Sequence, residues 1–237
     1  MKLFIDSANL EEIKKYLDQG LCDGVTTNPT TFFKLGIKGN DIKKRVLEIA
    51  TLINPLPLSV EVTSENPEEI MKQAREFSSW ADNIVVKVTV TDSRGNSLLA
   101  AIHQLVKDGI TVNVTMVMTF NQAILTAKSI AAGMRESAIG GLRKHCISIF
   151  AGRISEEYGV ETAFGIIRDA VEWLKIHEFE YVEILIASIR NPENIEYFSK
   201  AGGHIMTVPP EALSKSLVSS RTKEGVAQFM EDAKKSQ

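Results

Sequence analysis

Short apolar segments alternate with amphipathic segments along the whole chain, and this alternation restricts the fold more than any other feature. The predicted strands are residues 3–6, 24–27, 58–62, 84–88, 111–117, 146–150, 182–187 and 204–208. They recur roughly every thirty residues, which is the spacing of repeated strand–helix units. Eight such units in 237 residues predict a single-domain α/β fold, a (β/α)8 or TIM barrel over residues 1–237. The alternative is a doubly wound open sheet, but no glycine-rich dinucleotide motif follows the first strand.

The segments between the strands have helical periodicity. Leu10, Ile13 and Leu17 lie on one face of a predicted helix, as expected for a helix that covers a sheet. No proline- or serine-rich linker divides the chain. Residues 223–236 are predicted to form a C-terminal helix, which we expect to pack on a neighbouring subunit.

Composition excludes several classes of partner. The chain is 44% hydrophobic and 24% charged, with a net charge of −3 and a pI of about 5.9. This balance argues against nucleic acid or an anionic membrane as a partner, and no apolar run has the length of a membrane span. Cys22 and Cys146 lie far apart without metal-ligand spacing, which predicts unpaired thiols of a reducing compartment. With no apolar leader after Met1, we expect a cytoplasmic protein.

A lysine occupies the predicted strand 84–88, where a charged side chain is unusual. The run from Asn83 to Val88 is short, rich in β-branched residues and apolar on both faces, as in a buried parallel strand. Burial disfavours an ammonium, so Lys87 must be paired or become a neutral amine. A neutral amine attacks carbonyl carbons, which predicts Schiff-base chemistry. The alternative is a strand-end lysine whose ammonium reaches water.

Other polar residues lie toward the carboxyl ends of the predicted strands. They are Asp6, Asn28, Glu61, Asn113, Thr115, Arg153, Ser188 and Arg190. Each has an ordinary structural explanation: Asp6 would cap a helix near Asn9, for example, and Asn28 would begin a turn. Together with Lys87 they gather at the face where barrels carry catalysis, so we interpret them as an active site.

The candidate residues suit carbon–carbon bond cleavage through an iminium on Lys87. A carboxylate must take the proton from the hydroxyl of the departing carbon, and either Asp6 or Glu61 would serve. Glu61 with Thr115 would hold a water that shuttles protons during imine formation. Positioned proton transfers of this kind typically contribute about 10²–10⁴-fold each. Amides such as Asn28 and Asn113 would orient sugar hydroxyls.

A separate group is suited to binding an anion. Arg153, Ser188 and Arg190 bring two guanidiniums and a hydroxyl, which fit a phosphate or sulfonate at the far end of a substrate. Alternatively, the arginines pair with surface carboxylates. The four histidines are scattered without ligand spacing, so no metal site is predicted.

The chain resembles the small transaldolases and fructose-6-phosphate aldolase, a family of the Schiff-base class I aldolase superfamily. The resemblance covers nearly all of the sequence through residues 4–9 (FIDSAN), 24–30 (GVTTNPT), 81–88 (ADNIVVKV), 113–115 (NVT), 121–123 (NQA), 150–153 (FAGR), 187–192 (ASIRNP) and 207–210 (TVPP). It implies a (β/α)8 barrel without a metal or an organic cofactor, usually assembled as a homo-oligomeric ring of several subunits.

The resemblance also implies a role for each matching residue. Lys87 would form the Schiff base, Asp6 would be the general acid–base, and Glu61 with Thr115 would hold the catalytic water. The substrate contacts would come from Asn28, Thr30, Asn113, Phe150, Arg153, Ser188 and Arg190. At positions 61 and 150 the transaldolases have glutamate and phenylalanine, whereas the aldolase has glutamine and tyrosine. Glu61 and Phe150 therefore match the transaldolases. Transfer of a dihydroxyacetone unit is therefore favoured over its release, and an inactive barrel that binds sugar phosphates is the remaining alternative.

Two segments depart from the family pattern. Thr89 stands where the family usually has proline, and residues 90–97 form a slightly longer loop whose Arg94 is a candidate anion contact at the catalytic mouth. These changes leave a non-standard donor such as sulfofructose open. Residues 131–144 precede a strand, so they belong on the opposite rim. Their basic residues, Arg135, Arg143 and Lys144, are expected to serve packing or assembly.

Overall fold

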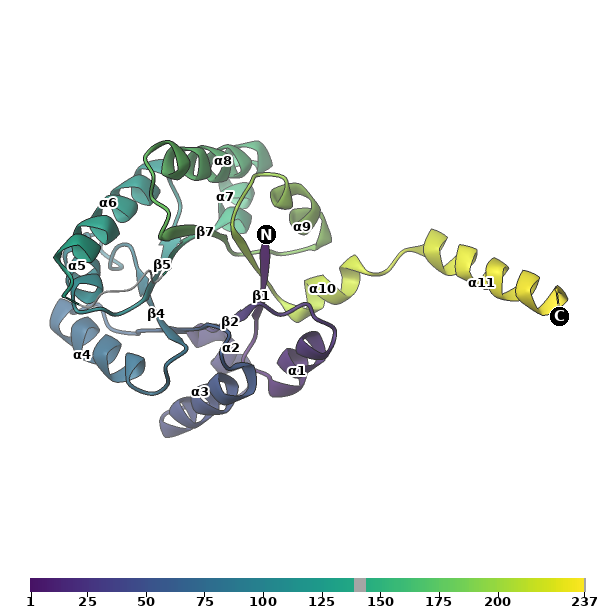
Figure 1. Ribbon diagram of the computed structural model, residues 1–237, viewed down its shortest axis with the longest axis horizontal. Helices are drawn as coiled ribbons and strands as arrows, with labels where there is room; N and C mark the ends of the chain where they lie inside the picture. The colour runs from purple at the N-terminus through teal and green to yellow at the C-terminus, as the bar shows by residue number, and fades with distance from the viewer. Residues whose placement is uncertain (139–143, 237) are drawn as a thin grey trace.

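The protein folds as a closed barrel of eight parallel strands surrounded by helices (Figure 1). The computed structural model describes residues 1–138 and 144–236. The strands are β1 Lys2–Asp6, β2 Gly24–Thr26, β3 Leu58–Glu61, β4 Ile84–Thr89, β5 Val112–Val117, β6 His145–Ile149, β7 Val182–Ile186 and β8 Ile205–Val208. They follow one another around the barrel in sequence order, and β8 pairs with β1. The predicted (β/α)8 barrel is confirmed, with strand ends within two residues of the expected positions.

Helices follow every strand and carry local signals at their starts. They are α1 Leu10–Asp18, α2 Pro29–Lys34, α3 Asn40–Ile53, α4 Pro67–Ser78, α5 Leu99–Lys107, α6 Phe120–Glu136, α7 Ala151–Tyr158, α8 Val160–Ile176, α9 Pro192–Ser199, α10 Pro210–Ser216 and α11 Ser220–Lys235. Asn28, Asn66 and Asn191 each cap the N-terminus of a helix whose first residue is proline, which is a favoured arrangement. No described helix combines the length and apolar character needed to cross a membrane.

The sheet has an apolar core on each side, a larger one between the strands and the helices and a smaller one inside the barrel. Residues that point outward, such as Val86 and Val88 of β4, pack under the helices in the larger core. Phe4, Leu185 and Ile205 point inward and, with Cys146 and Ala187, form a smaller cluster inside the barrel. Gly24 has no side chain because the Phe4 ring occupies the space, where a Cβ would lie 2.6 Å from Phe4 Cζ. This inner cluster closes the barrel below the polar residues.

Strand register brings the inward polar residues to one level. Glu61 is paired with Lys87 across β3 and β4, and Lys87 with Asn113 across β4 and β5. Because side chains alternate along a strand, the inward position after Asn113 is Thr115. The register of β5 against β6 shifts between Val114 and Val117. Polar groups therefore occupy the carboxyl-terminal end of the barrel interior.

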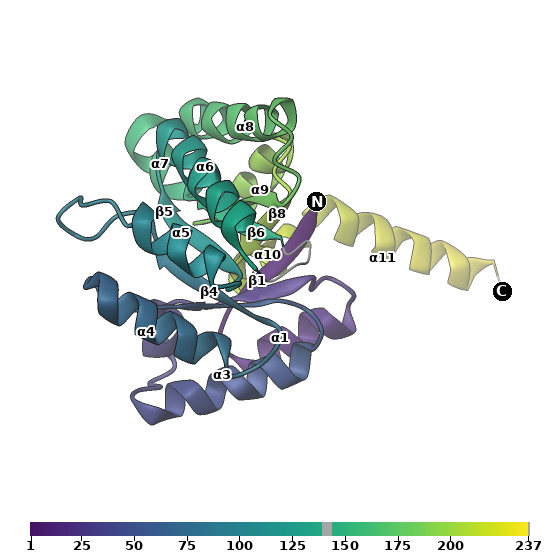
Figure 2. The ribbon, with the colours of Figure 1, turned by 60° about the vertical axis from the view of Figure 1, so that its left-hand side comes forward.

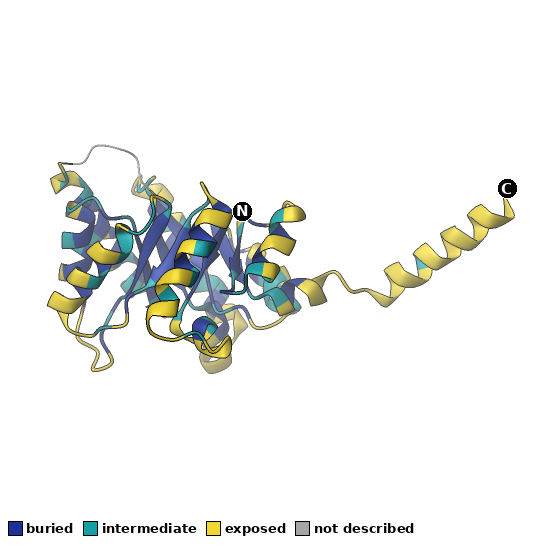
Figure 3. Cartoon of the chain, turned by 90° about the horizontal axis from the view of Figure 1, so that it is seen from below, coloured by how far each residue is buried: buried dark blue, intermediate teal, exposed yellow. Residues whose placement is uncertain are grey.

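The C-terminal helix α11 projects away from the barrel (Figures 1 and 2). It begins with a side-chain cap from Ser219 but has no buried residue, and Figure 3 shows it exposed along its length. Val226, Phe229 and Met230 lie on one face of it, and the Phe229 side chain is 74% exposed.

The two unusual segments lie on opposite rims of the barrel. In the loop after β4, Asp92 accepts hydrogen bonds from Arg94 and Asn96, and these bonds lower its pKa to about 2. Residues 131–136 continue α6, with Arg135 in its last turn. Lys144 lies beside Lys2 at the amino-terminal end of the barrel, where both approach the Glu183 carboxylate at 3.5 and 3.0 Å. Arg143 lies outside the described residues.

Candidate active site

Lys87 lies inside the barrel as one member of a buried ion pair. Its Nζ is 2.9 Å from Glu61 Oε2, and the two side chains are 7% and 15% exposed. Nζ also donates to the Thr27 carbonyl oxygen at 3.4 Å. The lysine therefore does not reach bulk water, and Glu61 supplies the partner that a buried cation requires.

Asp6 lies near this pair at the end of β1. Its Oδ1 accepts hydrogen bonds from Thr26 Oγ1 at 3.1 Å and from Asn28 Nδ2 at 3.2 Å. Burial raises the pKa of the Asp6 carboxyl above its ordinary value of 3.8, although the Lys87 charge opposes this shift. The cap of α1 is the side chain of Asn9, so Asp6 does not have the capping role that was its alternative explanation. A partly buried carboxyl with a raised pKa is suited to exchange protons.

Asn113 and Ser148 form a buried hydrogen-bonded pair below the cavity. Ser148 Oγ donates to Asn113 Oδ1 at 2.7 Å, and Asn113 Nδ2 donates to Ser59 Oγ at 3.1 Å. Ser148 also lines the cavity, but the sequence analysis missed it. The available signal was its inward position in the apolar strand β6, two residues from Cys146.

Thr115 is fully buried, and its Oγ1 has no hydrogen-bond partner among the described residues. A buried hydroxyl without a partner is rare and calls for an explanation, such as a bound water or a catalytic role. The next residue, Met116, has a φ of 60° at the irregularity in β5 and lines the cavity. A β-bulge changes the direction of side chains near active sites. Here it coincides with the unpaired hydroxyl.

The predicted anion-binding residues gather where α7 meets the loop after β7. Ser188 has a φ of 64°, and its buried Oγ has no partner among the described residues. Gly152 lets the first turn of α7 approach Ser188, because a Cβ there would lie 1.8 Å from the Ser188 carbonyl oxygen. The Arg153 guanidinium lies 5.7 Å from the centre of the Phe150 ring, while Arg190 Nε is 3.4 Å from Glu156 Oε1. The helix amides and Arg153 favour an anion at this corner, whereas Arg190 is also paired with a surface carboxylate, as its alternative explanation predicted.

A cavity of about 640 Å³ connects these groups at the carboxyl-terminal mouth of the barrel. Among the predicted residues, those that line it are Asp6, Asn28, Thr30, Glu61, Lys87, Phe150, Arg153, Ser188 and Arg190. Asn113 and Thr115 are buried on β5, the strand beside Lys87. Arg94 does not line the cavity; its side chain is 74% exposed and pairs with Asp92 at 3.1 Å. The structure thus brings together all the predicted site residues except Arg94.

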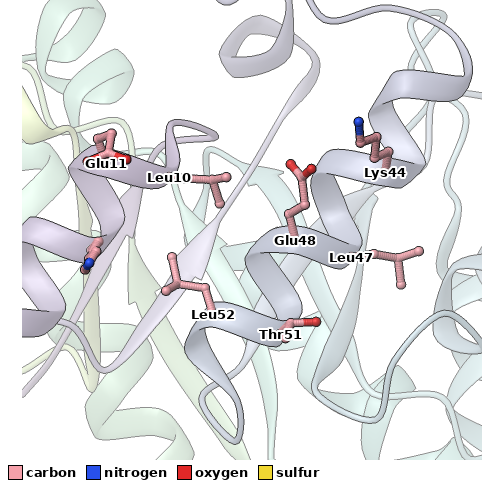
Figure 4. A pocket seen from close by; sticks show the side chains of 8 residues that line it. Leu10, Glu11, Lys44, Leu47, Glu48, Thr51 and Leu52 are labelled. Atoms are coloured by element: carbon pink, nitrogen blue, oxygen red, sulfur yellow. The ribbon is translucent and has the colours of Figure 1, made fainter.

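A second hollow of about 620 Å³ lies outside the barrel between α1 and α3 (Figure 4). Its apolar surface comes from Leu10, Leu47 and Leu52. Charged groups, including Lys44 and Glu48, border it. None of the predicted site residues lines this groove, so the active-site candidate is the cavity in the barrel. Within residues 1–138 and 144–236, no group of three His, Cys, Asp or Glu side chains is arranged to hold a metal ion.

Comparison with solved structures supports the fold. The crystal structure of dihydrodipicolinate synthase from Thermotoga maritima superposes with a TM-score of 0.61 at 13% sequence identity, covering 90% of this chain and 71% of that chain. A designed cube-shaped protein cage superposes with a TM-score of 0.53 at 11% identity, covering 99% and 76% of the two chains. At these identities the likeness concerns the fold alone.

Sequence comparison identifies the family. A protein of Dehalococcoides mccartyi named probable transaldolase is 38% identical over 234 residues, covering 99% of this chain and 98% of that protein. A probable transaldolase of Alkaliphilus metalliredigens is 37% identical over 232 residues, covering 98% and 97%. The family model described as Transaldolase/Fructose-6-phosphate aldolase matches residues 3–237. The chain therefore belongs to the transaldolase/fructose-6-phosphate aldolase family.

Proposed function

We propose that this protein is a Schiff-base transaldolase that moves a dihydroxyacetone unit from an anionic ketose to an aldehyde phosphate such as glyceraldehyde 3-phosphate. The observation that carries the proposal is the buried Lys87–Glu61 pair on the wall of a cavity that also contains Asp6. A lysine held this way is directed at the substrate, and an adjacent carboxylate can accept the proton that it must lose before it attacks.

The reaction begins when Lys87 Nζ adds to the ketone carbon and water leaves to give an iminium. Asp6 then takes the proton of the hydroxyl on the departing carbon. The O–H electrons form the new aldehyde, while the electrons of the broken carbon–carbon bond move onto the iminium nitrogen. The resulting enamine adds to the acceptor aldehyde, and water releases the product from Lys87. Glu61 holds the water that shuttles protons together with the hydroxyl of Thr115, which has no partner in the described part of the chain.

The substrate anion binds between α7 and the loop after β7. Arg153 and Arg190 provide positive charge there, and the buried Ser188 hydroxyl provides a donor that has no partner among residues 1–138 and 144–236. These groups can donate hydrogen bonds to the oxygens of a phosphate or of a sulfonate such as 6-sulfofructose, because both are tetrahedral anions. Arg94 has no part in this proposal, since Asp92 holds its guanidinium.

Dependence on an acceptor aldehyde tests the transaldolase assignment. We expect a ketose phosphate alone to give at most slow release of dihydroxyacetone, and added glyceraldehyde 3-phosphate to raise donor consumption at least about tenfold, because the retained enamine needs an acceptor. Sedoheptulose 7-phosphate, fructose 6-phosphate and 6-sulfofructose should be compared as donors by kcat/KM. Rapid release of dihydroxyacetone without acceptor would identify a fructose-6-phosphate aldolase instead. No turnover and no borohydride-trapped adduct with any of these donors would identify a barrel that only binds sugar phosphates.

We also propose that α11 holds the chain in a homo-oligomeric ring. Val226, Phe229, Met230 and Ala233 form one face of a helix that has no buried residue. The groove between α1 and α3 offers an apolar surface of similar kind, bordered by both lysines and glutamates. Insertion of α11 of one copy into the groove of the next is a head-to-tail contact, which forms a ring when the rotation closes.

Lysine substitutions that introduce one charge on α11 or in the groove test this assembly. Phe229→Lys places an ammonium in the proposed contact and is expected to shift the protein to smaller species in light scattering coupled to gel filtration. Leu47→Lys in the groove should have the same effect. Gln228→Lys is the matched control, because Gln228 lies on the opposite face of α11. If Leu47→Lys left the assembly intact while Phe229→Lys disrupted it, α11 would dock elsewhere.

A further inference from the structure

We infer that Thr207 is a positioning residue that acts through Thr26 to hold the Asp6 carboxyl, leaving Asp6 Oδ2 as the atom that exchanges the substrate proton. This inference rests on the proposed role of Asp6 as the general acid–base. It adds to that role a specific oxygen atom and two residues that no sequence motif assigned to catalysis.

The three side chains form a continuous chain of hydrogen bonds across β8, β2 and β1. Thr207 Oγ1 lies 2.6 Å from Thr26 Oγ1, and Thr26 Oγ1 lies 3.1 Å from Asp6 Oδ1. Thr26 is 2% exposed and Thr207 5%, yet all three residues line the cavity. Buried hydroxyls with short contacts have fixed orientations, so this series of hydrogen bonds can hold the Asp6 carboxyl in one rotamer.

The direction of these hydrogen bonds follows from the acceptor. An ionised carboxylate can only accept, so the Thr26 hydroxyl donates its proton to Asp6 Oδ1. Thr26 has no second proton, and the Thr207 hydroxyl must therefore donate to Thr26 Oγ1. Asn28 Nδ2 also donates to Oδ1, at 3.2 Å. Within the described part of the chain, Oδ2 has no hydrogen-bond partner.

This asymmetry assigns different tasks to the two oxygens. Two donors occupy Oδ1, so the proton from the substrate hydroxyl transfers to Oδ2 during bond cleavage. The O–H electrons become the second bond of the aldehyde, and the electrons of the broken carbon–carbon bond form the double bond of the enamine as the iminium nitrogen takes back its electron pair, which balances the step. Oδ2 returns the proton when the enamine adds to the acceptor.

The hydrogen bonds from Thr207 through Thr26 to Asp6 form a relay, and the charges around Asp6 determine how its loss would change the pKa of the Asp6 carboxyl. Burial raises the pKa of Asp6; Lys87, the Thr26 hydrogen bond and Lys34 lower it, and Glu61 raises it. Removing the Thr207 hydroxyl weakens the donation from Thr26, so the pKa of Asp6 should rise further. The base must be ionised to accept a proton, and the acid limb of the rate profile should therefore move to higher pH.

Thr207→Val tests the relay because it removes the hydroxyl while it keeps the shape of the side chain. We expect kcat to fall about 10- to 100-fold, since small misplacements of reacting groups have effects of this size. The acid limb of kcat/KM should move upward in pH, and Thr207→Ser should restore both values. Borohydride trapping of dihydroxyacetone on Lys87 should continue in all variants, because imine formation from this probe breaks no carbon–carbon bond.

A readout that is independent of turnover separates this inference from the proposed function. The Asp6 carboxyl carbon can be followed by ¹³C NMR titration, with Asp6→Asn to assign its signal. A higher pKa in Thr207→Val than in the wild type would support the relay even if no transaldolase activity were found. Equal pKa values and superimposable pH profiles in Thr207→Val and wild type would overturn it. A loss of activity that Thr207→Ser did not restore would also overturn it, since the methyl group would then be responsible.

Discussion

Replacing Lys87 by methionine is expected to abolish covalent capture of the ketose and to lower transfer activity by at least about 10⁴-fold, the scale seen when a catalytic nucleophile is removed. Methionine fills the same space but has no amine. The change also leaves the Glu61 carboxylate without its 2.9 Å partner. An unpaired buried charge costs about 3–5 kcal/mol, so the variant should unfold more readily.

Lys87→Arg separates chemistry from stability. The guanidinium keeps the positive charge beside Glu61 but does not condense with ketones. Activity should therefore fall as far as in Lys87→Met, while the free energy of unfolding should change less. The measurement is the mass of the adduct after borohydride treatment with dihydroxyacetone, with the labelled peptide identified. Lys34→Met is the comparison, because Lys34 also lines the cavity but is exposed. An adduct on Lys34, or one that persists in Lys87→Met, would contradict the assignment.

The residues that the sequence revealed are those whose chemistry conflicts with their surroundings. Lys87 is conspicuous because an ammonium is unexpected in a run of valine and isoleucine, and Asp6 and Glu61 are carboxylates at the ends of apolar strands. Thr26 and Thr207 carry no such signal, because threonine is a common strand residue whether or not its hydroxyl is used. Their relationship depends on the closure of β8 onto β1, a pairing between residues that are far apart in sequence.

Backbone geometry limited the prediction in a second way. The Thr115 hydroxyl and the left-handed conformation of Met116 lie where the register of β5 against β6 shifts. Nothing in the local sequence requires this irregularity. The conformation of the loop after β4 also could not be predicted. The position of Arg94 after a strand predicted that it lies near the mouth of the barrel, but the hydrogen-bonded loop around Asp92 directs its guanidinium away from the cavity.

Gly152→Ala is expected to damage both the anion site and the fold, because the helix α7 and the Ser188 segment are in backbone contact at this point. The added Cβ would lie 1.8 Å from the Ser188 carbonyl oxygen and 3.1 Å from Arg190 Cγ. A backbone atom cannot rotate aside, so one segment must move, at a cost of about 3 kcal/mol in the free energy of unfolding. The Ser188 hydroxyl and the amides of α7 would then no longer converge.

Gly165→Ala is the matched control for this substitution. Gly165 lies within α8, and a Cβ there would meet no atom within 4 Å. Alanine should therefore stabilise the protein by up to about 1 kcal/mol through its higher helix propensity. In urea unfolding the two variants should shift in opposite directions. In kinetics, Gly152→Ala should raise KM for an anionic donor and leave capture of uncharged dihydroxyacetone on Lys87 unchanged. An unchanged KM for the anionic donor would show that the substrate anion binds elsewhere, since this contact sets the position of every group proposed to hold it.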